Sequence, residues 1–306
     1  MKGQVDRSSP LVSVVVPTLN AASLIDACLS SIAAQSYLNV ELIIVDGHSS
    51  DETVDRARTY TDRVFVFGPR GGGQRVFGAP PQRNYGAAKA RGSYIYYVDA
   101  DMVLPPTLIE ECVTQARITG ADALIVPERS VGIGFWAEVK AVERECYVGD
   151  DLVEAPRFIS TDAWRSLNGL DVSMGGNDDW DLHNRLRAGG WVVGRVSQEV
   201  LHNEGHLRLG RLARKRFLYG RYIPHFLRRY GMRQSIRHYN PFRRYFAQRK
   251  VLAKRPLHLL GLVAMRTVEY AAGGLGLMIG LLAEWGVKQS GELDTSYPGQ
   301  VERKDV

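Results

Sequence analysis

Two aspartates, Asp99 and Asp101, stand directly after the apolar and aromatic run 94–98 and shortly before two prolines. Side chains alternate between the two faces of a strand, so acids two residues apart point the same way. Two such carboxylates repel each other unless a cation lies near them. Oxygen ligands of this kind suit Mg²⁺ or Mn²⁺, which proteins often share with substrate phosphates. A solvated strand end before a proline turn is the alternative interpretation.

A second group of acids, Asp178, Asp179 and Asp181, opens a segment whose pattern predicts a helix over 178–188. The helix dipole favours acids in a first turn, which explains part of this cluster. Three acids in four residues exceed what capping requires. One of them, held in a partly dry cleft, could act as a general base.

The elements that must position these acids follow an alternating pattern. Short β-branched runs at 11–16, 40–45, 64–67 and 94–98 are separated by helical patterns. This alternation predicts a doubly wound, mostly parallel α/β sheet. Such sheets bind ligands at the carboxyl ends of their strands, where the strand order reverses. Pro17, Thr18, Asn20 and Asp46 follow the first two strands, so we expect them at the same sheet edge as the aspartate pair.

Later segments are less regular. The pattern predicts helices at 82–91, 107–119 and 134–147, a strand at 123–126 and an extended segment at 157–159. The Asn-Glu-Gly sequence between His202 and His206 favours a loop there, although a His-x-x-x-His spacing on a helix would suggest zinc.

Five segments in this order carry a resemblance to a known family. They are Pro-Thr-Leu-Asn at 17–20, the acidic loop at 44–53, Gln-Arg-Asn at 82–84, Val-Asp-Ala-Asp at 98–101 and Asp-Asp-Trp-Asp at 178–181. Together they resemble the signature of the family 2 glycosyltransferases, over residues 11–220. The resemblance implies the GT-A fold, a nucleotide-sugar donor, inversion at the anomeric carbon and a Mn²⁺ or Mg²⁺ cofactor.

The resemblance also implies roles for individual residues. Asp101 would bind the metal that bridges the diphosphate, and Asp99 would face the ribose or the metal. Asp179 corresponds to the catalytic base and Asp178 stands where relatives carry Glu. His202 would complete the metal shell, with structural hydrogen bonding as its alternative role. The implied donor-binding set is Pro17, Thr18, Asn20, Asp46, Arg83, Asp99, Ala100 and Asp101, and the implied acceptor or diphosphate side is Arg157, Trp180 and Arg214.

Departures from the family pattern limit what the resemblance implies. Ala21 and His48 stand where relatives have other residues, so both UDP and GDP remain candidate donor nucleotides. The Gln-x-x-Arg-Trp motif of processive synthases is missing, and a basic segment at 214–220 occupies its approximate place. We therefore predict the addition of single sugars.

Charge is strongly segregated along the 306 residues. Residues 205–268 carry 17 Lys and Arg and no acid, so the rest of the chain is acidic although the whole has a net charge of +6. A basic block indicates an anionic partner, either nucleic acid or lipid headgroups. The apolar segment that follows, 257–283, favours lipid, and the cleft acids would repel a nucleic acid.

This apolar segment is interrupted by Arg266 and Glu269, which could pair on one helix face. We expect two amphipathic or re-entrant helices in the membrane interface. The alternatives are one spanning helix, or a helical hairpin packed on the enzyme or on a second subunit. Membrane attachment fits a lipid-linked glycan or polyprenyl phosphate acceptor and a place at the cytoplasmic face of the membrane.

The expected organisation is a catalytic domain at 11–205, a helical membrane-associating region at 206–289, and disordered ends at 1–10 and 290–306. No signal-peptide pattern precedes residue 11, and three cysteines without metal-ligand spacing indicate a reducing compartment. We expect no nucleic-acid partner, and a homo-oligomer could form through the C-terminal helices.

Competing interpretations are a nucleotidyltransferase that makes nucleotide sugars, a basic nucleic-acid-binding protein, and a silent scaffold. The first would require a glycine-rich basic loop after the first strand, which residues 17–22 do not provide.

Overall fold

The computed structural model describes residues 9–68 and 79–290. Its main sheet has seven strands in the order β3-β2-β1-β4-β8-β6-β9. All neighbours are parallel except β8, which runs antiparallel to both β4 and β6. The strands are β1 (Val12–Thr18), β2 (Val40–Asp46), β3 (Val64–Val66), β4 (Tyr94–Tyr97), β6 (Ala123–Ile125), β8 (Pro156–Ser160) and β9 (Val193–Arg195). The predicted mostly parallel, doubly wound sheet is confirmed, and its strand order reverses at β1.

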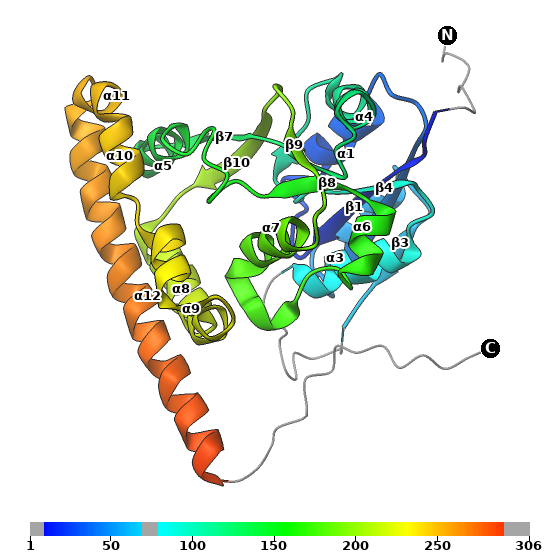
Figure 1. Cartoon of the computed structure of the whole chain (residues 1–306). Helices are drawn as coiled ribbons and strands as arrows, with labels where there is room; N and C mark the ends of the chain where they lie inside the picture. The colour runs from blue at the N-terminus through cyan, green and yellow to red at the C-terminus, as the bar shows by residue number, and fades with distance from the viewer. Residues whose placement is uncertain (1–8, 69–78, 291–306) are drawn as a thin grey trace.

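Helices cover both faces of this sheet (Figure 1). In β1, Val14 and Val16 face one core cluster and Val15 faces the other, as alternation along a buried strand requires. The first cluster is closed by α1 (Ile25–Ala33) and α4 (Leu108–Thr119), and α2 (Thr53–Arg58) lies beside α1. The second cluster is closed by α3 (Pro80–Lys89), α6 (Thr161–Ser166) and α7 (Asp178–Ala188), which follows the short 3₁₀ helix η1 (Val172–Asn177).

A second, three-stranded sheet extends the carboxyl edge of the first. It contains β5 (Met102–Val103), β10 (Val200–His206) and β7 (Glu128–Ile133), followed by α5 (Phe135–Glu145). The prediction of a loop at 202–206 is wrong, because this segment pairs with β7 and continues as a strand. Its irregular sequence is accommodated by a break in register between Asn203 and His206 and by the positive φ of Gly205.

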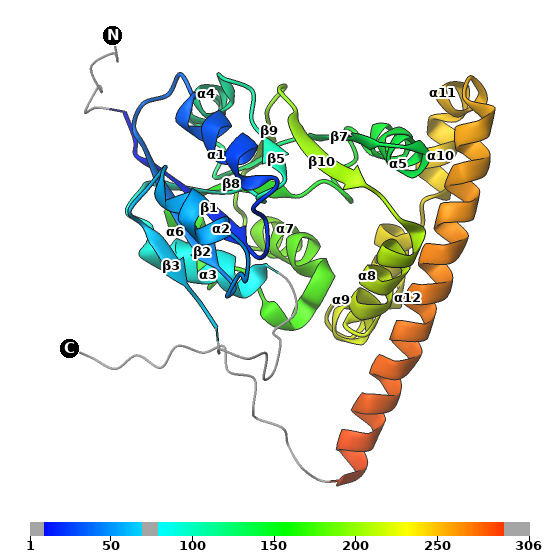
Figure 2. The ribbon, with the colours of Figure 1, turned by 180° about the vertical axis from the view of Figure 1, so that it is seen from behind.

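The C-terminal region is helical and packs on α5 and η1. It comprises α8 (Leu209–Gly220), α9 (Ile223–Tyr239), α10 (Phe242–Ala247), α11 (Arg249–Ala253) and α12 (Pro256–Ser290). Figure 2 shows α12 as one long helix along this side of the molecule, with α8 beside it. The predicted disordered ends lie almost wholly outside the described residues, and the predicted domain boundary at 205/206 falls at the end of β10.

The prediction of two C-terminal helices is wrong, because α12 is continuous over 35 residues. Arg266 and Glu269 lie on the face turned toward α5 and α8, where their side chains pair at 2.6 Å between Nη1 and Oε2. The charges that interrupt the apolar sequence therefore do not interrupt the helix. Packing of α12 on the enzyme agrees with the packed alternative.

Glycines allow α8 and α12 to touch at their backbones. A Cβ atom on Gly276 would collide with the carbonyl oxygen of Phe217, whereas a Cβ on Gly274 would meet open space. We expect Gly276→Ala to lower the free energy of unfolding by about 1–3 kcal/mol, since overpacking forces the helices apart. Gly274→Ala should raise it by about 0.5–1 kcal/mol through helix propensity. Denaturant unfolding of both variants checks this pair, and equal effects would contradict the close crossing.

Candidate functional site

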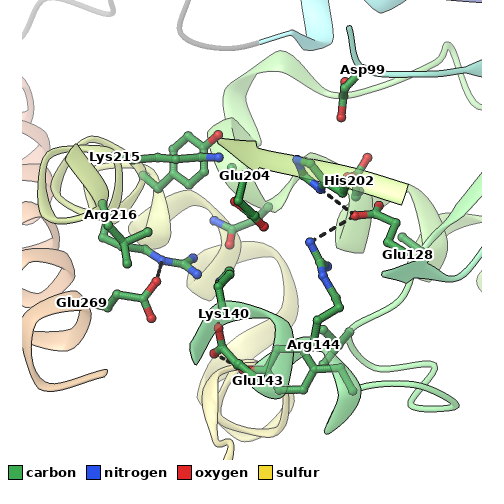
Figure 3. Close-up of a pocket in the computed structure, with 18 of the residues that line it drawn as sticks. Asp99, Glu128, Lys140, Glu143, Arg144, His202, Glu204, Lys215, Arg216 and Glu269 are labelled. Atoms are coloured by element: carbon green, nitrogen blue, oxygen red, sulfur yellow. Dashed lines mark hydrogen bonds and ion pairs between the residues drawn. The ribbon is translucent and has the colours of Figure 1, made fainter. Parts of the chain in front are cut away.

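A cavity of about 730 Å³ lies at the carboxyl edge of the main sheet, between that edge, the second sheet and the C-terminal helices. Figure 3 shows the part of it around β10, with Asp99 and His202 at one end. Eight of the predicted site residues line the cavity: Arg83, Asp99, Asp101, Arg157, Asp178, Asp179, Trp180 and His202. Pro17, Thr18, Asn20, Asp46, Ala100 and Arg214 are not among its lining residues. The sheet thus gathers acids that are far apart in the sequence.

The residues after β1 and β2 form a hydrogen-bonded turn beside this cavity. Thr18 Oγ1 donates to Asp46 Oδ1 at 2.9 Å, and the amide of Ser49 donates to Asp46 Oδ2 at 2.7 Å. Asn20 has a positive φ of 51°, and its Oδ1 accepts from the amide of Ser50 at 2.8 Å. The buried Asp46 therefore fixes the loop after β2, and base recognition by these residues stays a prediction.

Asp99 is held by two arginines. Its Oδ1 accepts from Arg83 Nη2 at 2.6 Å and its Oδ2 from Arg157 Nη1 at 3.2 Å. Both guanidinium groups lie over the ring of Tyr97, at 4.7 and 5.5 Å from its centroid. Burial alone would raise the pKa of Asp99, but the two guanidinium groups outweigh it and the pKa is lowered. Asp99 is thus an ionised, arginine-bound carboxylate.

Asp101 differs from Asp99 because one of its carboxylate oxygens can still accept a hydrogen bond or bind a cation. Among the described residues its buried Oδ1 has no hydrogen-bond partner, and its Oδ2 lies 3.3 Å from His202 Nε2. The other ring nitrogen of His202, Nδ1, lies 3.1 Å from Glu128 Oε2. Burial lowers the pKa of His202, but the bonds to Asp101 and Glu128 raise it to about 10. An orphaned buried carboxylate oxygen is costly unless something binds it.

These groups fit a divalent cation. Asp101 Oδ2 and His202 Nε2 face each other at 3.3 Å, so a cation that displaced the proton between them would meet an oxygen and a ring nitrogen, while Glu128 orients the ring through its other nitrogen. In the described part of the chain no cluster of three or more His, Cys, Asp or Glu side chains could hold a metal by itself. Two protein ligands completed by substrate phosphates and water is the arrangement that Mg²⁺ commonly adopts.

The three acids of α7 have different surroundings. Asp178 is buried, and burial followed by the charge of Asp179 raises its pKa well above the usual range. Asp181 is fully buried and pairs with Arg185 and Arg229, each at 2.7 Å. Asp179 faces the cavity with 30% of its side chain exposed, and its Oδ1 accepts from the hydroxyl of Tyr97 at 3.1 Å. The same Oδ1 of Asp179 lies 3.3 Å from Arg83 Nη1. Asp179 is the most exposed of the three acids, and its role as a base stays a prediction.

The family model described as glycosyl transferase family 2 matches residues 13–168 of this chain. The chain is a family 2 glycosyltransferase. Its relatives include the glycosyltransferase GlyG of Streptococcus pneumoniae, 35% identical over 120 residues (38% of each chain), and the succinoglycan biosynthesis protein ExoA of Rhizobium meliloti, 26% identical over 226 residues (68% and 67%). A PGL/p-HBAD biosynthesis glycosyltransferase of Mycobacterium tuberculosis is 37% identical over 98 residues (31% and 36%). These matches span between about a third and two thirds of the relatives' own lengths.

Solved structures share the fold of this glycosyltransferase. Residues 1–349 of TarS from Staphylococcus aureus, in complex with UDP, align with a TM-score of 0.52 at 13% identity, covering 92% of both chains. The mannosyltransferase PcManGT of Pyrobaculum calidifontis, in complex with GDP-Man and Mn²⁺, aligns with a TM-score of 0.52 at 19% identity, covering 93% of this chain and 77% of that one. The GT-A fold prediction is confirmed. The family assignment also decides against the nucleotidyltransferase interpretation.

Glu128 of the glycosyltransferase lines the cavity but is not among the residues predicted from the sequence. This carboxylate pairs with Arg144 Nη2 at 3.0 Å and Arg157 Nη2 at 2.8 Å, and these arginines hold its pKa well below the usual range despite burial. A signal existed, since Glu128 follows the apolar run 123–126 as Asp99 follows 94–98. Its contact with His202 of β10 could not be predicted, because the sequence of that segment favours a loop.

Two other predicted residues of the glycosyltransferase take structural contacts in this cavity. Arg157 binds Asp99 and Glu128, so it joins the two sheets as well as lining the site. The indole of Trp180 donates through Nε1 to the carbonyl oxygen of Val153 at 3.1 Å. Whether either contacts the acceptor or the diphosphate stays a prediction.

Proposed function

We propose that this glycosyltransferase moves one sugar from a UDP- or GDP-linked donor, with inversion, to a hydroxyl or phosphate of a lipid-linked acceptor in cell-envelope glycan synthesis. The observation that carries the proposal is that Asp101, His202 and Asp179 face one cavity at the carboxyl edge of the sheet. The names of ExoA and of the mycobacterial relative connect those proteins with succinoglycan and PGL/p-HBAD biosynthesis. The two structural neighbours hold UDP, and GDP-Man with Mn²⁺.

The arrangement supplies what an inverting transfer needs. Asp179 accepts the proton of the acceptor oxygen as that oxygen bonds to the anomeric carbon and the diphosphate leaves with the electron pair of the broken bond. Asp101 and His202 would hold Mn²⁺ or Mg²⁺, which when bound neutralises charge on the departing diphosphate. Arg83 and Arg157 hold Asp99 in place. The raised pKa of Asp178 favours its protonated form, and this supports Asp179 as the base.

A donor panel tests the proposed activity. Purified protein is incubated with UDP- and GDP-sugars and Mn²⁺ or Mg²⁺, and release of UDP or GDP is measured. We expect metal-dependent release from one nucleotide class. Neither binding nor hydrolysis of any member would contradict the proposal. A long homopolymer from a single donor would contradict the addition of single sugars.

The outer face of α12 supports attachment to a membrane. Leu257, Leu260, Leu275, Leu282 and Trp285 are all more than half exposed on this helix. By length and composition alone, the described part of the chain has one helix that could cross a membrane, spanning residues 256–283. An apolar face of this kind can bind the membrane interface through buried area and attraction to anionic lipids.

The inner face of α12 argues against a spanning orientation. There Glu269 pairs with Arg216 of α8 at 2.9 Å and with Arg266. Since α8 packs along α12 (Figure 2), insertion would take these charges into hydrocarbon. Each charge at the centre of a membrane costs about 2.5–3.5 kcal/mol. We therefore place α12 in the plane of the cytoplasmic membrane surface.

Vesicle binding tests this placement. We expect Leu275→Gln with Leu282→Gln to weaken binding to anionic vesicles about tenfold or more, because two leucine side chains leave the apolar phase. Ile118→Gln, at an exposed position of α4, is the matched control and should bind like the unchanged protein. Alkaline carbonate should release the protein from membranes. Resistance to carbonate would indicate a spanning helix instead.

A further prediction concerns the residue behind His202. Glu128→Gln should weaken Mn²⁺ binding about 10- to 100-fold, because the imidazole loses the carboxylate that orients it. Calorimetry or electron paramagnetic resonance measures this binding without any assay of activity. Glu199→Gln, which removes a solvent-exposed partner of Arg129 near the same sheet, is the control. Equal Mn²⁺ affinity in both variants would exclude a positioning role for Glu128.

A further inference from the structure

The cavity continues well beyond the metal-binding end. It passes Glu204 of β10 and reaches a second end formed by α5, α8 and α12 (Figure 3). Two acids, Glu143 and Glu269, line this second end. Five cations accompany them: Lys140, Arg211, Lys215, Arg216 and Arg266. The second end therefore carries an excess of positive charge, opposite in sign to the acid-rich end at the sheet edge.

The deeper cations are already partnered. Lys140 Nζ lies 2.7 Å from Glu143 Oε2, and Arg216 Nε lies 2.9 Å from Glu269 Oε1. The Lys140–Glu143 pair lies within α5, whereas Arg216–Glu269 joins α8 to α12 and Arg266–Glu143 joins α12 to α5. Ion pairs of the two buried acids therefore hold the three helices in fixed relation. They provide a rigid floor for the second end.

Arg211 and Lys215 are different. They lie one helical turn apart on the same face of α8, line the cavity, and are exposed at its mouth. Within the described residues no carboxylate lies within ion-pair distance of either; Lys215 contacts only the ring of Tyr219, with Nζ 5.7 Å from its centroid. Arg211 and Lys215 lie beside the other cations of the second end. Together these positive charges attract an anion.

We propose that Arg211 and Lys215, above Lys140 and Arg216, bind the phosphate of an acceptor whose apolar chain lies along α12. This inference rests on the proposed transfer reaction and names the acceptor as a phosphate ester of an apolar alcohol. Tyr270 and Gly273 of α12 line the same cavity, while the opposite face of that helix is apolar and exposed. One molecule can thus place its phosphate among these cations and its chain in the membrane surface. Guanidinium and ammonium groups are the usual partners of phosphate oxygens.

The test compares variants in and directly after α8. Arg211→Gln with Lys215→Gln removes both unpaired cations and no ion pair among the described residues, so the fold should persist. Arg221→Gln is the matched control, since Arg221 is exposed directly after α8 but does not line the cavity. Binding of citronellyl phosphate, a short soluble prenyl phosphate, is measured by calorimetry. We expect the double variant to bind it about 10- to 100-fold more weakly, and Arg221→Gln to stay within about twofold.

Two further measurements separate the sources of phosphate. Metal-dependent hydrolysis of the donor should be unchanged in the double variant. A matching loss of hydrolysis would assign the cations to the donor diphosphate and overturn the proposal. Unchanged citronellyl phosphate binding together with lost binding to anionic vesicles would assign them to membrane headgroups, which also overturns it. If the unchanged protein hydrolyses no nucleotide sugar, the proposed function fails, while the calorimetric comparison still decides whether this end binds phosphate.

Discussion

Asp101→Asn is expected to lower metal-dependent transfer by about 10³-fold. Within the part of the chain that the structure describes, the buried Oδ1 of Asp101 has no partner, whereas both oxygens of Asp99 are bound by arginines. A metal that stabilises a departing diphosphate contributes several kcal/mol, and each 1.36 kcal/mol is about tenfold in rate. Losing the main oxygen ligand should therefore remove most of the rate. Turnover is measured across a Mn²⁺ titration.

Metal binding and stability distinguish this effect from misfolding. The Mn²⁺ signal in electron paramagnetic resonance should fall in Asp101→Asn, while the unfolding temperature changes little because the amide keeps the size of the carboxylate. Asp55→Asn removes an exposed carboxylate of α2 and should leave both properties unchanged. Normal Mn²⁺ affinity in Asp101→Asn would move the metal site away from this residue.

Much of this arrangement could be predicted, because it depends on residue types that lie close together in the sequence. The β-branched run in 11–16 can only be buried, and polar residues directly after such runs must lie at a sheet edge. Asp99 and Asp101 follow that rule, and the structure places both in the cavity. The sequence could not predict that arginines bind Asp99 and not Asp101, since this depends on where the side chains of Arg83 and Arg157 lie.

What the sequence could not predict depends on partners distant in the chain. The 202–206 segment has no strand signature, and it becomes β10 because β7 and β5 pair with its two edges. The pairing of Arg266 with Glu269 on one helix face was predicted and is confirmed. The sequence could not show that Glu269 faces inward, where it also pairs with Arg216 of α8. Charges that look unfavourable in a membrane segment are thus the contacts that fix α12 beside the active site.

Asp179→Asn should spare donor binding and lower transfer by about 10²- to 10⁴-fold, the usual contribution of a general base. The amide keeps the size of the side chain and can still accept from the hydroxyl of Tyr97, so the site should retain its shape. Donor affinity is measured by calorimetry with UDP- or GDP-sugar, and transfer by product formation from the same donor.

The neighbouring acid provides the sharpest control. Because burial and the charge of Asp179 raise the pKa of Asp178, that carboxyl group binds a proton more readily than an ordinary aspartate. Asp178→Asn keeps the size of the side chain and removes a carboxyl group that is less suited to act as the base, so transfer should fall by no more than about tenfold. The opposite ranking, with Asp178→Asn inactive and Asp179→Asn active, would assign the base to Asp178. Equal losses would mean that the two acids act as one proton-sharing pair, since only a shared proton makes both residues indispensable to the same step.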